Sequence, residues 1–237
     1  MPRPSFADAI RFLRCERGAM AVEWVILAAG VTGMGLLALN SHRDSLGGFW
    51  YRINGEVSSV DTRSDFEDGT DGWTGSGAHS TDIPGFGRAL GPIDGSGGVA
   101  TVSRDFEITK GRTSTEITLD LYGLDSLDGE DAVFYVNGVE VGRIRGTSGT
   151  TETFAGTVDG VTFEGRLIDG GRNIGGYLNT GRQWDNDSIT EVKIKVDNPG
   201  DVVTVGVGST ANQRVSDESW AIDNVRVTGT KAKTPPA

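Results

Sequence analysis

The fold is decided by the stretch AVFYVNGVEV, residues 132–141. Two short runs rich in Val, Phe and Tyr, residues 132–136 and 139–141, flank the pair Asn137-Gly138. That pair favours the two-residue turn of a β-hairpin, because Asn and Gly adopt the positive φ angles that such a turn requires. The stretch therefore predicts two antiparallel β-strands joined by a tight turn.

Similar runs on both sides of this hairpin extend the prediction to a whole domain. They lie at residues 99–102, 115–121, 191–196, 202–207 and 221–227. Several alternate apolar and polar residues, as strands do when one face of a sheet is buried. No amphipathic helix of useful length appears after residue 64, and 36 glycines against seven prolines suit many tight turns. We therefore expect a mainly β fold, in which residues 65–229 form an antiparallel two-sheet β-sandwich, jelly-roll-like in connectivity, followed by a tail at 230–237.

The charge of the chain is unevenly distributed. The net charge is −11, yet residues 1–18 hold four arginines against Asp8 and Glu16. The acidic excess therefore lies after this segment, which argues against nucleic-acid binding, because that needs basic patches. An acidic surface suits a well-solvated exported domain, or one that binds calcium. The single cysteine, Cys15, excludes an intramolecular disulfide, so a bound cation would be another means of stabilisation.

A hydrophobic segment near the start predicts a membrane helix. Residues 19–39 form an apolar block with one charge, Glu23, and four arginines precede it. A helix of this length spans roughly 30 Å, the thickness of a hydrocarbon core. By the positive-inside tendency, the N-terminus stays in the cytoplasm and the sandwich is exported. The expected organisation is a basic leader at 1–18, a transmembrane α-helix at 19–40, and a linker or helix extension at 41–64.

This segment also carries a family resemblance. The stretch FLRCERGAMAVEW, residues 12–24, resembles the start of Flp/Tad-type type IVb pilins and their pseudopilin relatives. The resemblance implies that a prepilin peptidase cuts between Gly18 and Ala19. It also implies that Glu23 meets the N-terminal amine of a neighbouring pilin subunit, a pairing that offsets the cost of burying either charge in lipid. The implied location is the bacterial inner membrane with an exported C-terminal domain, which reaches a pilus or the cell surface.

The size of the chain departs from that family, because major Flp pilins are little more than the helix. A large domain after the helix indicates a minor pilin, a pseudopilin or a specialised tip subunit. The alternative is a plain single-pass anchor in which Glu23 is incidental.

A second resemblance concerns the sandwich. Residues 65–73, DFEDGTDGW, together with residues 218–225, ESWAIDNV, resemble the first and last strands of concanavalin-like and carbohydrate-binding-module-like jelly rolls. In those domains the two strands lie near each other, and acidic residues on them often hold a structural calcium ion. The resemblance thus implies a calcium site with Glu67 and Asp223 as the first ligand candidates. The further candidates by the same analogy are Asp65, Asp71 and Glu218.

A separate group of acidic residues is a second candidate for a cation. It comprises Asp125, Asp128, Glu130 and Asp131. It offers enough carboxylate oxygens for calcium but lacks the ligand spacing of an EF-hand. For this cluster and for the first one, the alternative is a set of solvated charges in turns and edge strands.

Catalytic patterns are missing from the sequence. The histidines are His42 and His79, and no Ser-His-Asp or Cys-His arrangement is suggested. A glycosidase needs only two carboxylates, but no motif marks a pair out among the many acids. We therefore expect no enzyme.

Sugar binding would need exposed aromatic rings. Trp184 lies in the polar stretch RQWDND, residues 182–187, and is the candidate ligand-binding residue. Its alternative is a loop aromatic that covers the edge of the sandwich, and Trp73 and Trp220 are expected in the core.

Three functional hypotheses follow from the sequence. The first is a pilin-like subunit of a Tad or type IVb pilus system that displays a calcium-stabilised sandwich for adhesion. The second is a membrane-anchored module that binds carbohydrates or surfaces without pilus assembly. The third is a surface hydrolase. The first is favoured, with a prepilin peptidase, other pilin subunits, the membrane, and glycans or surfaces as partners.

Overall fold

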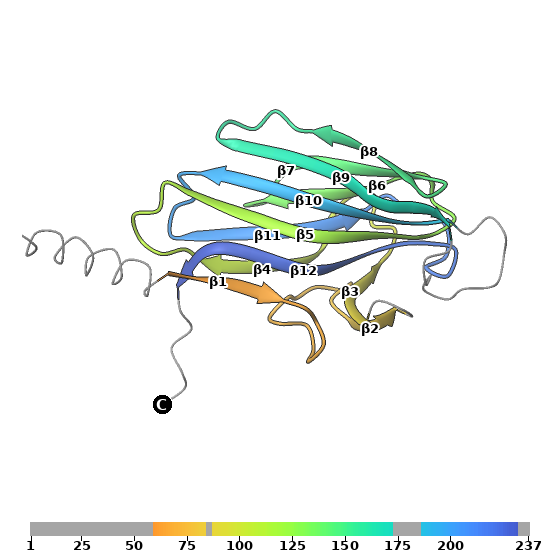
Figure 1. The fold of residues 1–237 in the computed structure, drawn as a ribbon, viewed down its shortest axis with the longest axis horizontal. Coiled ribbons are helices and arrows are strands. Elements are labelled where there is room, and N and C mark those ends of the chain that lie inside the picture. Colours follow the sequence, from red (N-terminus) through yellow and green to blue (C-terminus); the bar gives the residue numbers. More distant parts are fainter. Residues whose placement is uncertain (1–58, 84–86, 173–185, 232–237) are drawn as a thin grey trace, which may run out of the picture. The chain divides into compact units, whose positions relative to one another are not determined.

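The computed structural model describes residues 59–83, 87–172 and 186–231, which all belong to one unit of the chain, Ser58–Ala237. Two antiparallel sheets pack face to face (Figure 1), which confirms the predicted two-sheet β-sandwich. Within these ranges no helix is long and apolar enough to cross a membrane. The predictions made for the leader, the membrane helix, Gly18, Ala19, Glu23 and Trp184 lie outside the described residues.

The larger sheet has seven strands. Its order is β2 (Ser80–Ile83), β3 (Gly87–Ile93), β12 (Glu218–Lys231), β5 (Ser114–Asp125), β10 (Asp187–Asp197) and β9 (Val161–Arg172), and β1 (Ser59–Ser64) pairs with the far part of β12. The smaller sheet has five strands. Its order is β4 (Ala100–Glu107), β11 (Val202–Ser209), β6 (Asp128–Val136), β7 (Val139–Thr147) and β8 (Thr150–Ala155). Consecutive strands often change sheet, as β4 to β5 and β5 to β6 do, in keeping with a jelly-roll-like connectivity.

The hairpin predicted around Asn137-Gly138 is present. Strand β6 ends at Val136, β7 begins at Val139, and the two residues between them have φ angles of 51° and 77°. Both angles are positive, as a two-residue hairpin turn requires. The hairpin fixes which side chains of β6 face the core and which face solvent.

The core lies between the two sheets and is built by alternation along the strands. Ile117, Leu119 and Leu121 of β5 point inward from the larger sheet, and Phe134 points inward from the smaller one. Trp220 of β12 is fully buried among them, as expected from the sequence. Burial of each such side chain contributes about 1.5–3 kcal/mol to folding.

The start of the sandwich differs from the prediction. Residues 65–73 were expected to form the first strand, but they form turns, and the first strand is β1 before them. Phe66 and Asp71 have φ angles of 58° and 52°, which an extended strand does not allow. Strand β1 still pairs with β12, so the first and last strands of the domain are neighbours as expected.

Candidate functional site

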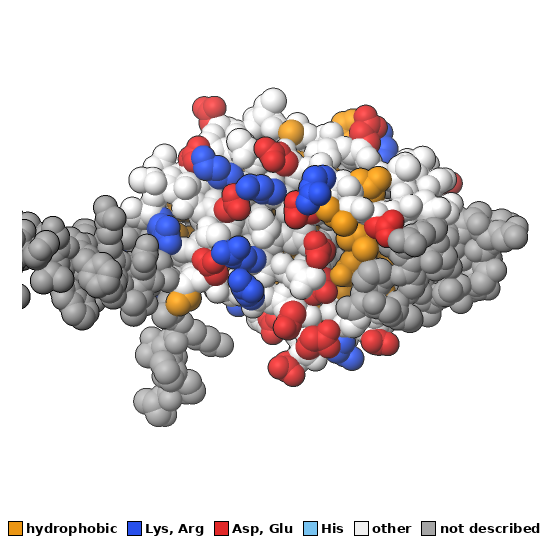
Figure 2. Space-filling model, viewed as in Figure 1, with side chains coloured by type: hydrophobic (Ala, Val, Ile, Leu, Met, Phe, Trp, Pro, Cys, Tyr) orange, Lys and Arg blue, Asp and Glu red, His pale blue; other side chains and the backbone are white. Residues whose placement is uncertain are grey.

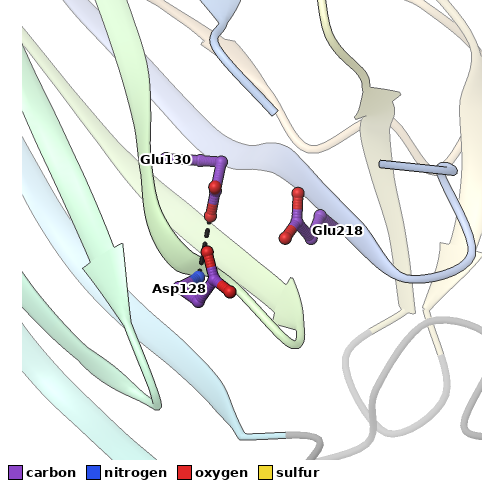
Figure 3. Close-up of side chains that lie close together, drawn as sticks. All are labelled: Asp128, Glu130 and Glu218. Atoms are coloured by element: carbon purple, nitrogen blue, oxygen red, sulfur yellow. Dashed lines mark hydrogen bonds between the residues drawn. The ribbon is translucent and has the colours of Figure 1, made fainter. Parts of the chain in front are cut away.

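Three carboxylates from both sheets meet at one end of the sandwich (Figure 3). Asp128 and Glu130 lie at the start of β6 in the smaller sheet, and Glu218 begins β12 in the larger sheet. Glu218 lies two residues before the inward-facing Trp220, so its side chain also points between the sheets. One carboxylate oxygen from each residue lies within 4.8 Å of the others.

Asp128, Glu130 and Glu218 are called the acidic cluster below. The loop between β11 and β12 holds this acidic cluster in place. The backbone N–H of Asn212 donates to Oε2 of Glu218 at 3.3 Å, and Nε2 of Gln213 donates to Oε1 at 2.7 Å. Nδ2 of Asn212 donates to Oε1 of Glu130 at 3.1 Å, and the backbone N–H of Asp128 donates to Oε2 of Glu130 at 2.7 Å. The two glutamates are thus fixed by neutral donors, which stabilise a negative charge less than a cation does.

The electrostatics of the acidic cluster are unfavourable without a cation. Glu218 is fully buried and Glu130 is 5% exposed, whereas Asp128 is exposed. Burial raises the pKa of Glu218, and the negative charges of Glu130 and Asp128 raise it further, against the hydrogen bonds from Asn212 and Gln213. Among the described residues, no Lys or Arg forms an ion pair with any of the three carboxylates.

The donor set fits a hard divalent cation such as calcium. Calcium takes six to eight oxygen ligands, mainly from carboxylates, carbonyls and water. The three carboxylates supply negatively charged oxygens, and the side-chain amides of Asn212 and Gln213 carry an oxygen each that would face the cluster after a half-turn. Exposed Asp128 gives the site an opening to solvent.

The pair Glu67 and Asp223, expected to ligate calcium, lies elsewhere. Asp223 is buried on the outer face of the larger sheet, where its Oδ1 accepts the backbone N–H of Asn224 at 2.7 Å and its Oδ2 accepts the Tyr122 hydroxyl at 3.4 Å. Glu67 is exposed and accepts the backbone N–H of Arg88 at 3.0 Å. Burial raises the pKa of Asp223 to about 6, with added effects from the charges of Asp120 and Glu67. Glu67 and Asp223 therefore interact, but in the described part of the chain the group of three carboxylates close enough for an ion is the acidic cluster.

The other expected ligands have separate positions. Asp65 is exposed, and its Oδ1 accepts the backbone N–H of Glu67 at 3.4 Å. Asp71 accepts the backbone N–H of Phe66 at 3.4 Å, so both aspartates support the turns after β1. Asp125 is buried at the end of β5, and its backbone N–H donates to Oδ1 of Asp187 at 2.8 Å. The structure thus keeps Asp128 and Glu130 of the second predicted group together and brings Glu218, which the sequence had assigned to the first group, beside them.

The raised pKa of Asp223 predicts a specific pH dependence of stability. Between the ordinary pKa of 3.8 and the folded value of about 6, the folded state keeps a proton that the unfolded state releases. The free energy of unfolding therefore falls as pH rises through this window. Above pH 6 the full loss of stability, about 1–3 kcal/mol, from keeping Asp223 ionised in its buried position is present. Asp223→Asn should flatten this decline in urea unfolding measured with EDTA at pH 4.5 and pH 7.5. The exposed Asp82→Asn is the control, and equal slopes for wild type and Asp223→Asn would contradict the assignment.

Comparisons with known proteins found remote similarity to solved structures alone. No protein-family model matches the chain, and no curated protein matches it. The chain is similar to the solved CBM22-1 xylan-binding domain of Xyn10C from Paenibacillus barcinonensis, at 15% identity over 74% of this chain and 98% of that one, with a TM-score of 0.37. It is also similar to the C-terminal CBM6 of LamC from Zobellia galactanivorans, at 13% identity over 71% of this chain and 99% of that one, with a TM-score of 0.37.

A third similar structure contains further parts. It comprises the CBM22-1 and GH10 modules of Xyn10B from Clostridium thermocellum, with 15% identity, 76% of this chain and 30% of that one covered, and a TM-score of 0.36. Likenesses this remote transfer neither ligand nor activity to this chain.

Proposed function

We propose that the sandwich is a non-catalytic module that binds carbohydrates or surfaces and is stabilised by calcium. The observation that carries this proposal is the outer face of the five-stranded sheet. Tyr135, Arg143, Arg145 and Phe154 stand on that face, on three neighbouring strands. Binding residues are held more accurately by strands than by loops, so this face is suited to recognition without rearrangement.

A network of ion pairs fixes the side chains of this face. Asp131 is 4% exposed, and its two oxygens accept Nε and Nη2 of Arg145 at 2.8 Å and 3.2 Å. Arg143 contacts the same carboxylate at 3.4 Å and makes two hydrogen bonds to Glu140, at 2.6 Å and 2.8 Å. The guanidinium of Arg145 also lies over the Phe154 ring, 4.9 Å from its centre. The charges in this network largely cancel, so the face offers shaped polar groups without strong net charge.

The opposite outer face, on the seven-stranded sheet, has a different character. Acidic and basic side chains are interspersed across it (Figure 2), and many of them pair with one another. Lys193 pairs with Glu116 at 2.8 Å, and Arg166 pairs with Glu191 at 3.0 Å. Such exposed pairs form a solvated surface and leave few groups for a ligand.

The chemistry of the described residues favours binding over catalysis. A general acid or base must reach its substrate and exchange a proton with it. Glu218 and Asp223, whose carboxyl pKa values are raised, are both buried away from the outer face of the five-stranded sheet. On that face, Asp131 and Glu140 are held by arginines, which favour the charged form of each carboxyl group.

Calcium is proposed to bind the acidic cluster of Asp128, Glu130 and Glu218. The cluster joins the first strand residues of β6 and β12, which belong to different sheets. A cation there would offset the mutual repulsion of the carboxylates and link the two sheets at one end. It would thereby stabilise the fold as a disulfide between the sheets would.

The test of the proposed function is binding of residues 58–231 to immobilised polysaccharides and to whole bacterial and host cells, in calcium. We expect retention on at least one glycan or cell surface, without release of new reducing ends. Release of reducing ends would contradict the non-catalytic proposal. Absence of retention on every surface would contradict the binding proposal itself.

A second proposal concerns how the module is carried, and the sequence around Gly18 favours it. A pilin-like N-terminus would be cut by a prepilin peptidase and would place the sandwich on a pilus or at the cell surface. N-terminal sequencing of the protein from its own membrane is expected to begin at Ala19, and substitution of Gly18 should abolish the cut. A start at Met1 would contradict pilin-type processing and leave a single-pass anchored module.

A further inference from the structure

A hollow of about 380 Å³ lies on the outer face of the five-stranded sheet. It is lined by Val99, Ala100, Ser103, Tyr135, Gly138, Thr204 and Gly206. These residues come from β4, β6 and β11 and from the segments beside them. The volume lies within the range of about 300–1,000 Å³ that is usual for small-ligand sites.

Tyr135 forms the aromatic side of the hollow. It alternates with the core residues Phe134 and Val136, so its ring faces outward, and it is half-buried. Its hydroxyl donates to the backbone carbonyl of Gly98, which fixes the ring at the far end. A ring held at both ends is a preorganised surface on which a ligand can stack at little entropic cost.

Gly206 forms the floor of the hollow. Gly206 lies opposite Tyr135 in the ladder between β11 and β6. A glycine inside a strand weakens that strand, and it often marks a place where a ligand or another backbone segment approaches closely. At Gly208 the approaching group is the backbone carbonyl of Val99, which would lie 2.2 Å from an added Cβ. At Gly206 the contacts of an added Cβ would be the Ala100 and Tyr135 side chains at 3.2 Å and 3.5 Å, so glycine there keeps the hollow open.

The lining selects an uncharged ligand. It contains no charged residue, although the chain as a whole carries −11. The nearby Asp105 is engaged with the Thr204 hydroxyl at 2.6 Å, and Arg143 is engaged with Glu140 and Asp131. The Ser103 hydroxyl has no hydrogen bond to any described residue, so it is available to a ligand. An aromatic ring, small neighbours and hydroxyl groups together match a sugar ring, which has an apolar face and a polar rim.

A larger groove of about 650 Å³, between β1 and β4, is a weaker candidate. Several of its charged residues already have partners, since Lys231 pairs with Glu107 at 3.3 Å and Asp61 pairs with Arg226 at 2.5 Å. It lacks the combination of an exposed ring and an open floor.

We propose that the hollow beside Tyr135 binds one uncharged sugar ring of a glycan, stacked on Tyr135 above Gly206. The Ser103 and Thr204 hydroxyls contact the edge of the sugar. This proposal rests on the proposed binding function and specifies where and by what chemistry it occurs. The site is neutral, so binding to it is insensitive to salt, unlike the binding of an acidic polysaccharide to basic residues.

The test uses the glycan retained most strongly in the binding experiment, titrated into wild-type protein and four variants by calorimetry. Tyr135→Ala should weaken affinity by about 10- to 100-fold, because it removes the stacking surface. Gly206→Val should weaken it similarly by filling the floor while leaving the ring in place. Tyr135→Phe, which keeps the ring, should lose less than about 10-fold, and Ile168→Ala, at an exposed apolar side chain on β9 of the other sheet, should bind as wild type.

The outcomes separate this proposal from the proposed function. Loss of affinity in Tyr135→Ala and Gly206→Val, with cooperative unfolding retained in both variants, supports the sugar site. The affinity of the wild type should also stay unchanged between about 0.05 and 0.5 M salt, a range over which the Debye length falls about threefold. Unchanged affinity in both variants overturns the site while the binding function stands. Loss in Ile168→Ala as large as in Tyr135→Ala overturns it as well, because the loss of binding then does not depend on the hollow. If neither a glycan nor a cell surface retains the protein, both proposals fail, whereas retention on a cell surface with no glycan bound overturns the sugar site alone.

Discussion

Trp220→Ala is expected to lower the free energy of unfolding by about 3–5 kcal/mol, the cost of removing a large buried aromatic side chain. Trp220 is fully buried, and its ring lies close to Gly123 and Gly146, which belong to different sheets. An added Cβ at Gly123 of β5 or at Gly146 of β7 would come within 3.0 Å and 2.9 Å of that ring. The two glycines thus make room for the indole, and no smaller side chain fills the same space.

Urea unfolding at pH 7 measures this effect, with Phe154→Ala at an exposed edge as the control. Trp220→Phe should lose less, about 1–2 kcal/mol, because it leaves a smaller cavity and removes a buried indole N–H that has no hydrogen bond to any described residue. A loss below about 1 kcal/mol for Trp220→Ala would mean that the sheets close over the gap, and the packing role assigned to Trp220 would be wrong.

Calcium at 1 mM is expected to raise the melting temperature of the wild-type sandwich by about 5–10 °C. This follows if calcium is present at about 100 times its dissociation constant, which stabilises the folded state by about 2.7 kcal/mol, with about 2–4 °C per kcal/mol for a domain of this size. The physical reason is the repulsion among Asp128, Glu130 and Glu218, which burial makes costly. Scanning calorimetry in calcium and in EDTA measures the difference.

Glu218→Gln should remove most of that increment, because it deletes the buried charge of the acidic cluster and keeps its shape. The matched control is Asp159→Asn, an exposed acid in the turn before β9, which should keep the full increment. An increment that survives Glu218→Gln but disappears in Asp223→Asn would move the calcium site to the Glu67 and Asp223 pair. No increment in the wild type would remove calcium from the proposed function.

The sequence predicts best those strands whose pattern reflects burial on one face. The strands β5, β10 and β11 alternate apolar and polar residues, and all three are present. The strands β8 and β9 were missed because their residues give no such signal: β8 is largely exposed, and β9 carries Gly165, Gly170 and Gly171. At Gly165 the small residue is required by packing, since an added Cβ would lie 2.4 Å from a side-chain carbon of Ile144.

The candidate site was predictable in composition but not in grouping. Acidic residues at the start of β6 and of β12 stand out in the sequence, and the candidates Asp128 and Glu218 were named from it. Their meeting depends on which sheet each strand joins and on the direction in which it runs, and neither follows from local pattern. Tyr135 was missed as a ligand candidate for a related reason. Its alternation with Phe134 and Val136 predicts an outward ring, but the open floor beneath it comes from Gly206 on a strand far along the chain.

The pairing of β1 with β12 has a consequence for how the domain is made. Asp61 and Arg226 form an ion pair across a sequence separation of 165 residues, and β12 also borders β3 and β5. The larger sheet therefore lacks its central strand until β12 has left the ribosome, and long-range pairing of this kind slows folding. During that interval the apolar faces of β5 and β10 stay exposed, so partly synthesised chains should depend on chaperones or on export in an unfolded form.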